Sequence, residues 1–481
     1  GLSLNAGFSL VTSWALRLQG IPVVHFVCDA GMSRCVLGTR QDDPSYSPPC
    51  AACKAQSRIN FSNAQVRRFR FHPDNSLENA IKSLALAELE NFSFQGMPLG
   101  RLVMPSLRWI LRRHHLVDDE PTRYLCQQYM LSAWNITQKF QAFLEQVSPR
   151  CLVIFNGQFF PEATVRHICL ERGIRVISHE VGLMPFSGFF TDGEATAYPI
   201  DIPVDFTLDD RQNARLDAYL SNRFQGHFLM AGVQFWPEIR NLSPEFTQRA
   251  AGFKQVVPVF TNVVFDTSQG HANTLYGNMF EWLDDVLQVI RANPETLFVI
   301  RAHPDELRQG KESRESVAGW ASANSITDLP NVIFINSTDY ISSYELIQLS
   351  KFVMVYNSTI GLEASILGKP VLCAGKARFT QINSVFFPES RAKFLETLDQ
   401  FLHAKDVQAP EEHRLNGRKF LYYQLYCTSL PFDAFLEDDR AWRGYVRVKQ
   451  TPLSALTPET SETIRVILDG IIKGQPFLLQ P

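Results

Sequence analysis

The sequence lacks long apolar runs, an excess of one charge and a high cysteine content. None of its hydrophobic runs reaches the about 18 residues that a transmembrane helix needs. With 46 Lys+Arg against 49 Asp+Glu, the formal net charge of −3 excludes a nucleic-acid binder that works by bulk positive charge. Nine cysteines in 481 residues are too few for a disulfide scaffold, and the sequence contains no internal repeat or low-complexity tract.

The overall composition is typical of a folded protein, with 45% hydrophobic and 20% charged residues. A chain of this length is typical of two or three domains. Residues 1–7 carry neither the basic start nor the cleavage pattern of a signal peptide. We therefore expect a cytoplasmic protein, which can also make peripheral contact with the inner face of the membrane.

Alternating strand and helix patterns predict an α/β protein. In the first half, a strand at 151–155 is followed by a helix at 161–172 and a strand at 174–178. A second alternating run begins with a strand at 256–260 and ends with one at 369–373. In open α/β sheets, ligands bind beyond the carboxyl ends of the strands, so polar residues at those ends are the candidate site.

A stretch rich in proline, charge and polar residues at about 235–254 is the best domain boundary. We expect an N-terminal α/β domain at 1–245 and a nucleotide-binding α/β domain at 246–430. A C-terminal helical tail at 431–481 is expected to pack back on the domains.

The most informative segment is Tyr356 to Val371, which combines a strand end, a small polar turn, a helix, a glycine stop and a second strand. Ser358 and Thr359 can cap the helix, and Gly361 lets a ligand approach the backbone. The helix start then suits a diphosphate, and the carboxylate of Glu363 can accept hydrogen bonds from a ribose. An ordinary capped helix with an acidic first turn explains the same pattern.

Two further strands end in residues that suit a phosphate ligand. Arg301 and His303 follow one strand, where a guanidinium and an imidazole can both donate to phosphate, although a His-Pro pair is also a common strand exit. Asn262 and Asp266 follow the first strand of this half, and they can contact a ligand or simply cap a turn.

These segments, in this order, resemble the capsule polysaccharide biosynthesis family of bacterial glycosyltransferases. The resemblance covers about 255–380, and in the first half it extends to Phe155-Asn156-Gly157 and His179-Glu180-Val181-Gly182. It implies a GT-B-like fold, with two Rossmann-type domains facing a central cleft and the first N-terminal strand missing. It also implies sugar transfer from a CMP-, UDP- or GDP-linked donor to a bacterial surface polysaccharide or a lipid-linked glycan, with no cofactor required for catalysis.

The same resemblance assigns roles to individual residues. By the resemblance, the donor nucleotide and its phosphates would be bound by Arg301, His303, Ser358, Thr359 and Glu363. From their positions at a strand end and a helix start, we add Asn262, Asp266 and Gly361 to the donor site. Asn156 and His179 would lie on the acceptor side. His303, Arg301 and the helix start at Ser358 would stabilise the departing phosphate without a metal. For the base that takes the acceptor proton, our leading candidate is Glu180, ahead of His179 and Asp192.

Three other functions fit the same features. A nucleotide-sugar 2-epimerase shares the two-domain architecture, and a teichoic-acid-type polyol-phosphate transferase uses similar His-Pro and Ser/Thr segments. The third is a glycan-binding assembly subunit that has lost its donor site.

Four cysteines crowd into one proline-rich loop: Cys28, Cys35, Cys50 and Cys53. Their spacing suits a structural zinc site or a disulfide, but Cys28 at a strand end can equally be a core residue.

Cations also alternate with rings at 66–72, and a basic helix is predicted at 106–115. Both suit an anionic glycan, a lipid-diphosphate acceptor or a membrane surface, and both are also typical of a solvated face. No base-reading motif accompanies them, so we expect no nucleic-acid partner.

Overall fold

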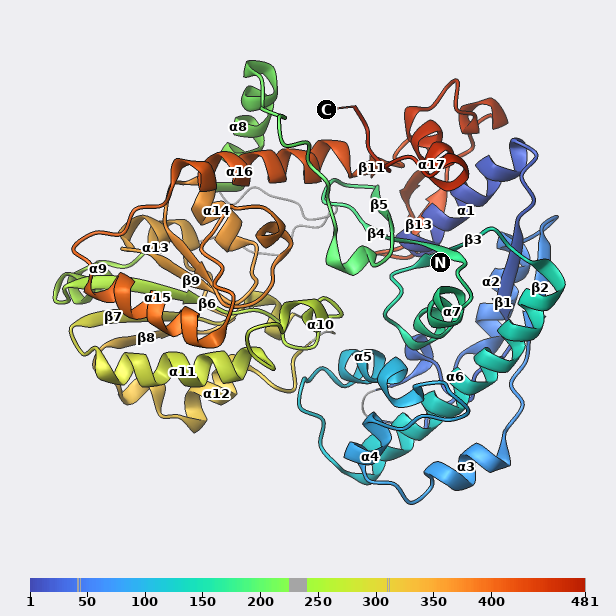
Figure 1. Cartoon of the computed structure of the whole chain (residues 1–481), viewed down its shortest axis with the longest axis horizontal. Coiled ribbons are helices and arrows are strands. Elements are labelled where there is room, and N and C mark those ends of the chain that lie inside the picture. The colour runs from blue at the N-terminus through green and yellow to red at the C-terminus, as the bar shows by residue number, and fades with distance from the viewer. Residues whose placement is uncertain (41–42, 44, 225–239, 309, 311, 481) are drawn as a thin grey trace. The chain divides into compact units, whose positions relative to one another are not determined.

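The computed structural model describes residues 1–481 except 41–42, 44, 225–239, 309, 311 and 481 (Figure 1). Contacts divide the chain into two compact units, each of which is described by itself below. Unit 1 comprises residues 1–111, 115–199 and 424–481, and unit 2 comprises residues 112–114 and 200–423.

Unit 2 is built around a five-stranded sheet with the order β10-β9-β6-β7-β8, in which every neighbouring pair is parallel. The strands are β6 (Gln255–Phe260), β7 (Thr296–Arg301), β8 (Val332–Ile335), β9 (Val353–Val355) and β10 (Val371–Cys373). The chain moves from β6 to β7 and β8 on one side and then returns to β9 and β10 on the other. This reversal is the Rossmann-type arrangement, and it places a topological switch between β6 and β9.

Helices cover both faces of this sheet. In Figure 1, α11 and α12 lie on one side of the strands, and α13, α14 and α16 lie on the other. The helices of unit 2 are α8 (Asp210–Phe224), α9 (Pro244–Ala251), α10 (Gln269–Ala272), α11 (Met279–Ala292), α12 (Val317–Ala323), α13 (Ser343–Leu349), α14 (Ile360–Ile366), α15 (Arg391–His403) and α16 (Glu411–Tyr422). Helix α11 begins where the Asn278 side chain accepts the amides of Phe280 and Glu281, and its buried stripe includes Trp282 and Val286.

Unit 1 contains a four-stranded sheet, β11-β5-β4-β3, and a separate parallel pair, β1-β2. The strands are β1 (Val24–Cys28), β2 (Gln65–Phe69), β3 (Cys151–Phe155), β4 (Arg175–Val181), β5 (Ser187–Asp192), β11 (Leu430–Pro431), β12 (Leu436–Asp438) and β13 (Val446–Val448). Strands β3 and β4 are parallel, whereas β5 and β11 run antiparallel to their neighbours. The α/β class expected from the sequence is confirmed.

The helices of unit 1 are α1 (Leu4–Leu18), α2 (Cys50–Asn60), α3 (Asn75–Ile81), α4 (Leu86–Glu90), α5 (Leu99–Leu111), α6 (Glu120–Val147), α7 (Phe160–Glu171) and α17 (Glu462–Lys473). The longest of them, α6, starts where the Asp119 carboxylate accepts the Thr122 amide. Its buried side carries Tyr129, Phe140 and Phe143, which join the core shared with α5 and α7.

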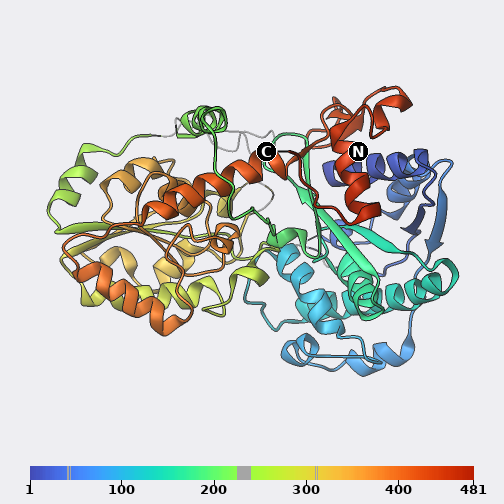
Figure 2. The ribbon, with the colours of Figure 1, turned by 45° about the horizontal axis from the view of Figure 1, so that its top comes forward.

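The division between the units differs from the boundaries expected from composition. The chain passes between the units at residues 199–200 and 423–424 rather than near 245 and 430. Helix α8 belongs to unit 2 because Arg223 pairs with Glu363 and Asp217 pairs with Arg418. The C-terminal segment is part of unit 1 and shares its core: α17 lies beside α1 (Figure 2), and Ile464 and Ile467 pack in one cluster with Phe8 and Val11.

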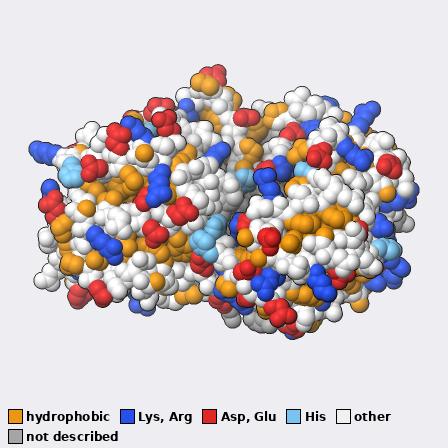
Figure 3. Space-filling model, turned by 60° about the horizontal axis from the view of Figure 1, so that its bottom comes forward, with side chains coloured by type: hydrophobic (Ala, Val, Ile, Leu, Met, Phe, Trp, Pro, Cys, Tyr) orange, Lys and Arg blue, Asp and Glu red, His pale blue; other side chains and the backbone are white. Residues whose placement is uncertain are grey.

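Among the described helices, none is both long and apolar enough to cross a membrane. On the face of the molecule shown in Figure 3, Lys and Arg side chains are interspersed with Asp and Glu side chains. This mixture agrees with the near-neutral net charge of −3.

Candidate functional site

The switch between β6 and β9 brings together two segments that lie almost a hundred residues apart in the sequence. Asn262 follows β6, and Asn357 follows β9. Their side chains meet, with Asn262 Nδ2 donating to Asn357 Oδ1 at 2.6 Å. Asn262 therefore lies at the carboxyl edge of the sheet, where open α/β sheets bind ligands. Asn357 lies at the same edge, and the sequence analysis did not single it out.

Arg301 closes β7, next to β6 in the sheet. Only 5% of its surface is exposed, and its guanidinium donates to the carbonyl of Ile341. Burial lowers the pKa of Arg301 to about 10, against the opposite effect of Asp339. The side chain therefore stays protonated at neutral pH and places a fixed positive charge behind the strand ends.

His303 lies two residues further on and is held in a defined tautomer. Its Nδ1 accepts the amide of Asp305 at 3.2 Å, so the ring proton must lie on Nε2. Burial lowers the pKa of His303, and the charge of Arg301 acts in the same direction, while Asp305 and Asp266 oppose it. At neutral pH His303 is thus a neutral imidazole with an Nε2–H donor. It also caps the turn at Pro304–Leu307, so the strand-exit reading of the His-Pro pair holds as well.

Asp266 lies in the loop after β6 and is exposed. Its carboxylate accepts Ser268 Oγ at 2.8 Å, and its carbonyl accepts the amide of Gln269. These bonds are those of a turn residue, which was the alternative interpretation of Asp266. Its charge still acts on His303, where it partly opposes the lowering of the pKa that burial causes.

The turn after β9 differs from the capped helix that was expected. Thr359 is the N-cap residue of α14, but its side chain makes no capping hydrogen bond. Ser358 is buried, and its carbonyl accepts the amide of Gly361 at 3.0 Å. Since α14 has only seven residues, its dipole is small, and side chains must supply most of the positive charge for an anion at this edge.

Gly361 packs closely against the side chains of Val355 and Phe379. A Cβ atom at this position would lie 2.9 Å from Val355 Cγ2 and 3.1 Å from Phe379 Cζ. The glycine lets α14 lie directly against β9.

Glu363 is buried within a network that the sequence did not indicate. Arg223 Nη2 lies 2.6 Å from Glu363 Oε1, and the Tyr344 hydroxyl donates to Oε2 at 2.5 Å. Burial lowers the pKa of Arg223, but Glu363 raises it, and the net shift is upward. Both carboxylate oxygens are thus engaged, so a ribose at Glu363 must share an oxygen with one of these partners or displace it.

Glu306 ends the Arg-x-His-Pro-x-Glu segment and lies in the interior. It is fully buried and accepts the Val317 amide at 3.0 Å and Ser337 Oγ at 3.2 Å. Burial raises the pKa of Glu306 to about 7, although both hydrogen bonds oppose the shift. Its role is to fix the segment that carries His303.

Glu306→Gln is expected to remove part of the pH dependence of stability. Because the folded state holds the Glu306 proton up to about pH 7 and the unfolded state releases it near 4.5, the stability contribution is complete below pH 4.5 and is lost as the pH rises through 7. The difference corresponds to at most about 3 kcal/mol. Urea unfolding at pH 5 and pH 8 should show a smaller loss for the variant than for the wild type. Glu295→Gln, at an exposed carboxylate paired with Lys254, should follow the wild type; equal losses in all three proteins would refute the assignment.

The second group of predicted residues lies in unit 1, where β3 and β4 end side by side. Glu180 Oε2 accepts Asn156 Nδ2 at 2.8 Å, and Oε1 accepts Asn5 Nδ2 at 3.2 Å and the Val181 amide at 2.8 Å. Asn156 adopts a positive φ of 59°, which turns the chain sharply after β3. Asn156 and Glu180 are thus brought together, and the carboxylate of Glu180 is held in a fixed orientation.

His179 and Asp192 do not suit a role as base. His179 is fully buried, its Nε2 lies 2.8 Å from Ser9 Oγ, and burial lowers its pKa to about 3. A side chain enclosed in this way does not reach an acceptor, which corrects the expectation for His179. Asp192 is exposed and forms a two-pronged ion pair with Arg175 at 2.6 and 2.8 Å.

The zinc site at the cysteine-rich loop stays a prediction, with Cys28, Cys50 and Cys53 close enough to Cys35 that, besides burial, their charges raise its pKa. Cys50 and Cys53 lie in the first turn of α2, and all four thiols are free. Burial raises the pKa of Cys35 to about 11, so this thiol stays protonated at neutral pH. Within the part of the chain that the structure describes, no group of three or more His, Cys, Asp or Glu side chains is placed to hold a metal ion.

The chain is similar in sequence to one curated protein over about half of its length. FixF of Sinorhizobium fredii (strain NBRC 101917 / NGR234) is 28% identical over 229 residues, which are 47% of this chain and 48% of FixF. The chain thus spans about half the length of this curated relative.

Solved structures that resemble this chain include two with low sequence identity and a low TM-score. The β-Kdo 2,4 transferase of Thermosulfurimonas dismutans KpsC is 10% identical, with a TM-score of 0.40 over 64% of this chain and 88% of that chain. The UDP-GlcNAc 2-epimerase of Neisseria meningitidis bound to UDP-GlcNAc is 14% identical, with a TM-score of 0.28 over 61% of this chain and 81% of that chain.

A family model described as "Capsule polysaccharide biosynthesis protein" matches residues 237–382. This segment contains β6 to β10 and the residues gathered at their carboxyl ends. The expected resemblance is confirmed over the segment that carries the candidate site, where the chain matches the model of the capsule polysaccharide biosynthesis family.

Proposed function

We propose that the chain is a glycosyltransferase that moves a sugar from a nucleotide-activated donor to a capsular glycan or its lipid-linked precursor. One observation carries the proposal. The family-matched segment folds into a parallel sheet whose switch point brings Asn262 and Asn357 together, and His303 follows the adjacent strand β7. This is the edge at which open α/β sheets take nucleotides.

The side chains at this edge suit the phosphate group of a departing nucleotide. His303 presents an Nε2–H donor, and Arg301 contributes a fixed positive charge that acts on the imidazole. As the bond between the sugar anomeric carbon and the phosphate oxygen breaks, negative charge grows on that oxygen. Pre-placed donors and charges stabilise such a group without reorganisation. The proposal needs no bound metal.

The acceptor side requires a base for the proton of the attacking hydroxyl. Glu180 is the best-oriented carboxylate among the predicted residues, since Asn5, Asn156 and the Val181 amide donate to its two oxygens. We assign it the removal of that proton as the new bond from the acceptor oxygen to the anomeric carbon forms. The nucleotide is proposed to be CMP, UDP or GDP.

A product analysis tests the function. The full chain is incubated with ¹³C-labelled CMP-, UDP- or GDP-sugars and capsular oligosaccharides, and the products are separated and weighed. Label on the oligosaccharide supports the proposal. Label that stays on the nucleotide as an isomerised sugar indicates an epimerase, transfer of a polyol phosphate indicates the teichoic-acid-type reaction, and no conversion indicates a binding subunit. The Glu180→Gln variant serves as the inactive control.

A further inference from the structure

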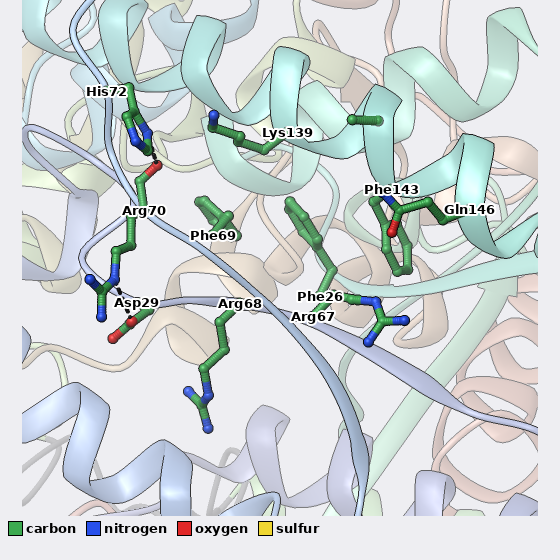
Figure 4. A pocket seen from close by; sticks show the side chains of 11 residues that line it. Phe26, Asp29, Arg67, Arg68, Phe69, Arg70, His72, Lys139, Phe143 and Gln146 are labelled. Atoms are coloured by element: carbon green, nitrogen blue, oxygen red, sulfur yellow. Dashed lines mark hydrogen bonds and ion pairs between the residues drawn. The ribbon is translucent and has the colours of Figure 1, made fainter.

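Unit 1 contains a cavity that lies away from the Glu180 group and is built on different strands. It opens between the parallel pair β1-β2 and the helix α6 and has a volume of about 530 Å³ (Figure 4). This is within the usual range of small-molecule sites, about 300–1,000 Å³. No residue that lines it belongs to the candidate sites described above.

Three rings close the bottom of the cavity. Phe26 stacks on Phe69 with centroids 4.4 Å apart, and Phe143 lies 5.3 Å from Phe26. Phe69 and Phe143 keep only 7% and 8% of their surface exposed, so the floor is recessed. Arg67 and Phe69 are two residues apart on β2, so their side chains point to the same face of the strand. Phe26 on β1 is paired with Arg67 and lies on that face as well.

Cationic side chains stand above this floor from both walls. Arg67 extends from β2, and Lys139 extends from α6 (Figure 4). Among the described residues, neither Arg67 nor Lys139 has an ion-pair or hydrogen-bond partner. Asp29 is the sole acidic residue that lines the cavity, and it is already paired with Arg70 at 2.9 Å.

This charge is local, because the chain as a whole carries a net charge of −3. Two unpaired cations above a recessed apolar floor are suited to a compact anion with an apolar surface. A bilayer is a poor match, since rings so deeply recessed cannot insert into lipid. For the same reason these rings cannot stack between the bases of a nucleic acid.

We infer that this cavity binds a segment of an acidic oligosaccharide. Its carboxylates pair with Arg67 and Lys139, and the C–H groups of its sugar rings contact the phenylalanine floor. The inference goes beyond the proposed function, because it assigns a second site, which binds the glycan at a distance from its reacting end. It rests on the proposed function for its role but not for its test, since binding is measured without any donor.

Calorimetric titration of the full chain with tetragalacturonate tests the site, with the neutral maltotetraose as the matched sugar. We expect tetragalacturonate to bind, maltotetraose to show no binding, and added salt to weaken binding. The double variant Arg67→Ala/Lys139→Ala should raise the Kd at least ten-fold without lowering the melting temperature, because neither side chain has a structural partner. Lys82→Ala, an exposed lysine outside the cavity, should leave the Kd unchanged.

Three results would overturn the inference. The first is no binding of tetragalacturonate to the wild type. The second is binding that survives the double variant or is shared equally by maltotetraose. The third is binding to phosphatidylglycerol vesicles, but not to tetragalacturonate, that is lost in the double variant, which would make the cavity a lipid headgroup site. Because nucleotide binding at His303 is measured separately, failure here leaves the proposed function standing.

Discussion

Glu180→Gln is expected to lower the turnover of sugar transfer by about 10²–10⁴-fold, the usual contribution of a general base. The amide oxygen can still accept hydrogen bonds from Asn5 and from the Val181 amide, whereas its NH2 group then faces Asn156 Nδ2 and that one bond is lost, at a cost of about 1 kcal/mol. The amide cannot take a proton from the acceptor hydroxyl. Steady-state kinetics of nucleotide release should therefore show a fall in kcat, while the increase of the melting temperature with nucleotide remains as in the wild type.

Asp192→Asn is the matched control for this prediction. Asp192 lies on β5, the strand next to β4, but its carboxylate is exposed and engaged with Arg175. Loss of an exposed ion pair costs at most about 1 kcal/mol, and turnover should stay within about two-fold of the wild type because no proton transfer is involved. A Glu180→Gln variant with full turnover, or an equal loss in Asp192→Asn, would remove Glu180 from its assigned role.

Glu363→Ala is expected to destabilise the protein by about 3–5 kcal/mol, the cost of leaving one partner of a buried ion pair unpaired. Arg223 and Glu363 expose only 14% and 6% of their side chains, so water cannot replace the lost carboxylate. Tyr344 loses the acceptor of its hydroxyl at the same time. Denaturant unfolding measures the loss directly.

Two comparisons separate this effect from a general sensitivity to charge removal. Glu396→Ala breaks an exposed pair with Lys393 in the same unit and should cost less than about 1 kcal/mol. The double variant Arg223→Met/Glu363→Ala should be more stable than Glu363→Ala alone, because it no longer buries an unpaired guanidinium. If the free energy of unfolding lost in the double variant equals the sum of the losses in the two single variants, the two side chains act independently.

Much of the fold could be predicted because its strands are short apolar runs with polar ends. The strand expected at 151–155 has the same bounds in the structure, and the strands expected at 256–260 and 369–373 are β6 and β10. Strand β2 was missed, since Gln65–Phe69 interleaves arginine with apolar residues and resembles a solvated loop. The boundary near 245 was misplaced because it followed composition, whereas the units are defined by pairs such as Arg223–Glu363.

The candidate site was only partly predictable for a similar reason. Strand-end residues such as Asn262 and His303 were found, because parallel strands bring their carboxyl ends to one edge. Arg223 could not be found, since it lies 140 residues from Glu363 and no local pattern links them. The close packing at Gly361 was also out of reach, because it involves Val355 and Phe379 across the fold.

Nucleotide binding at the edge formed by β6, β7 and β9 is the central claim, and a thermal-shift panel tests it most directly. One of CMP, UDP or GDP should raise the melting temperature of the wild type, since a ligand at 100 times its Kd adds about 2.7 kcal/mol of stability. His303→Ala should abolish the shift, and His403→Ala, at an exposed histidine of α15 in the same unit, should retain it. A wild type that responds to none of the three nucleotides, or a His303→Ala variant that responds fully, would contradict the account.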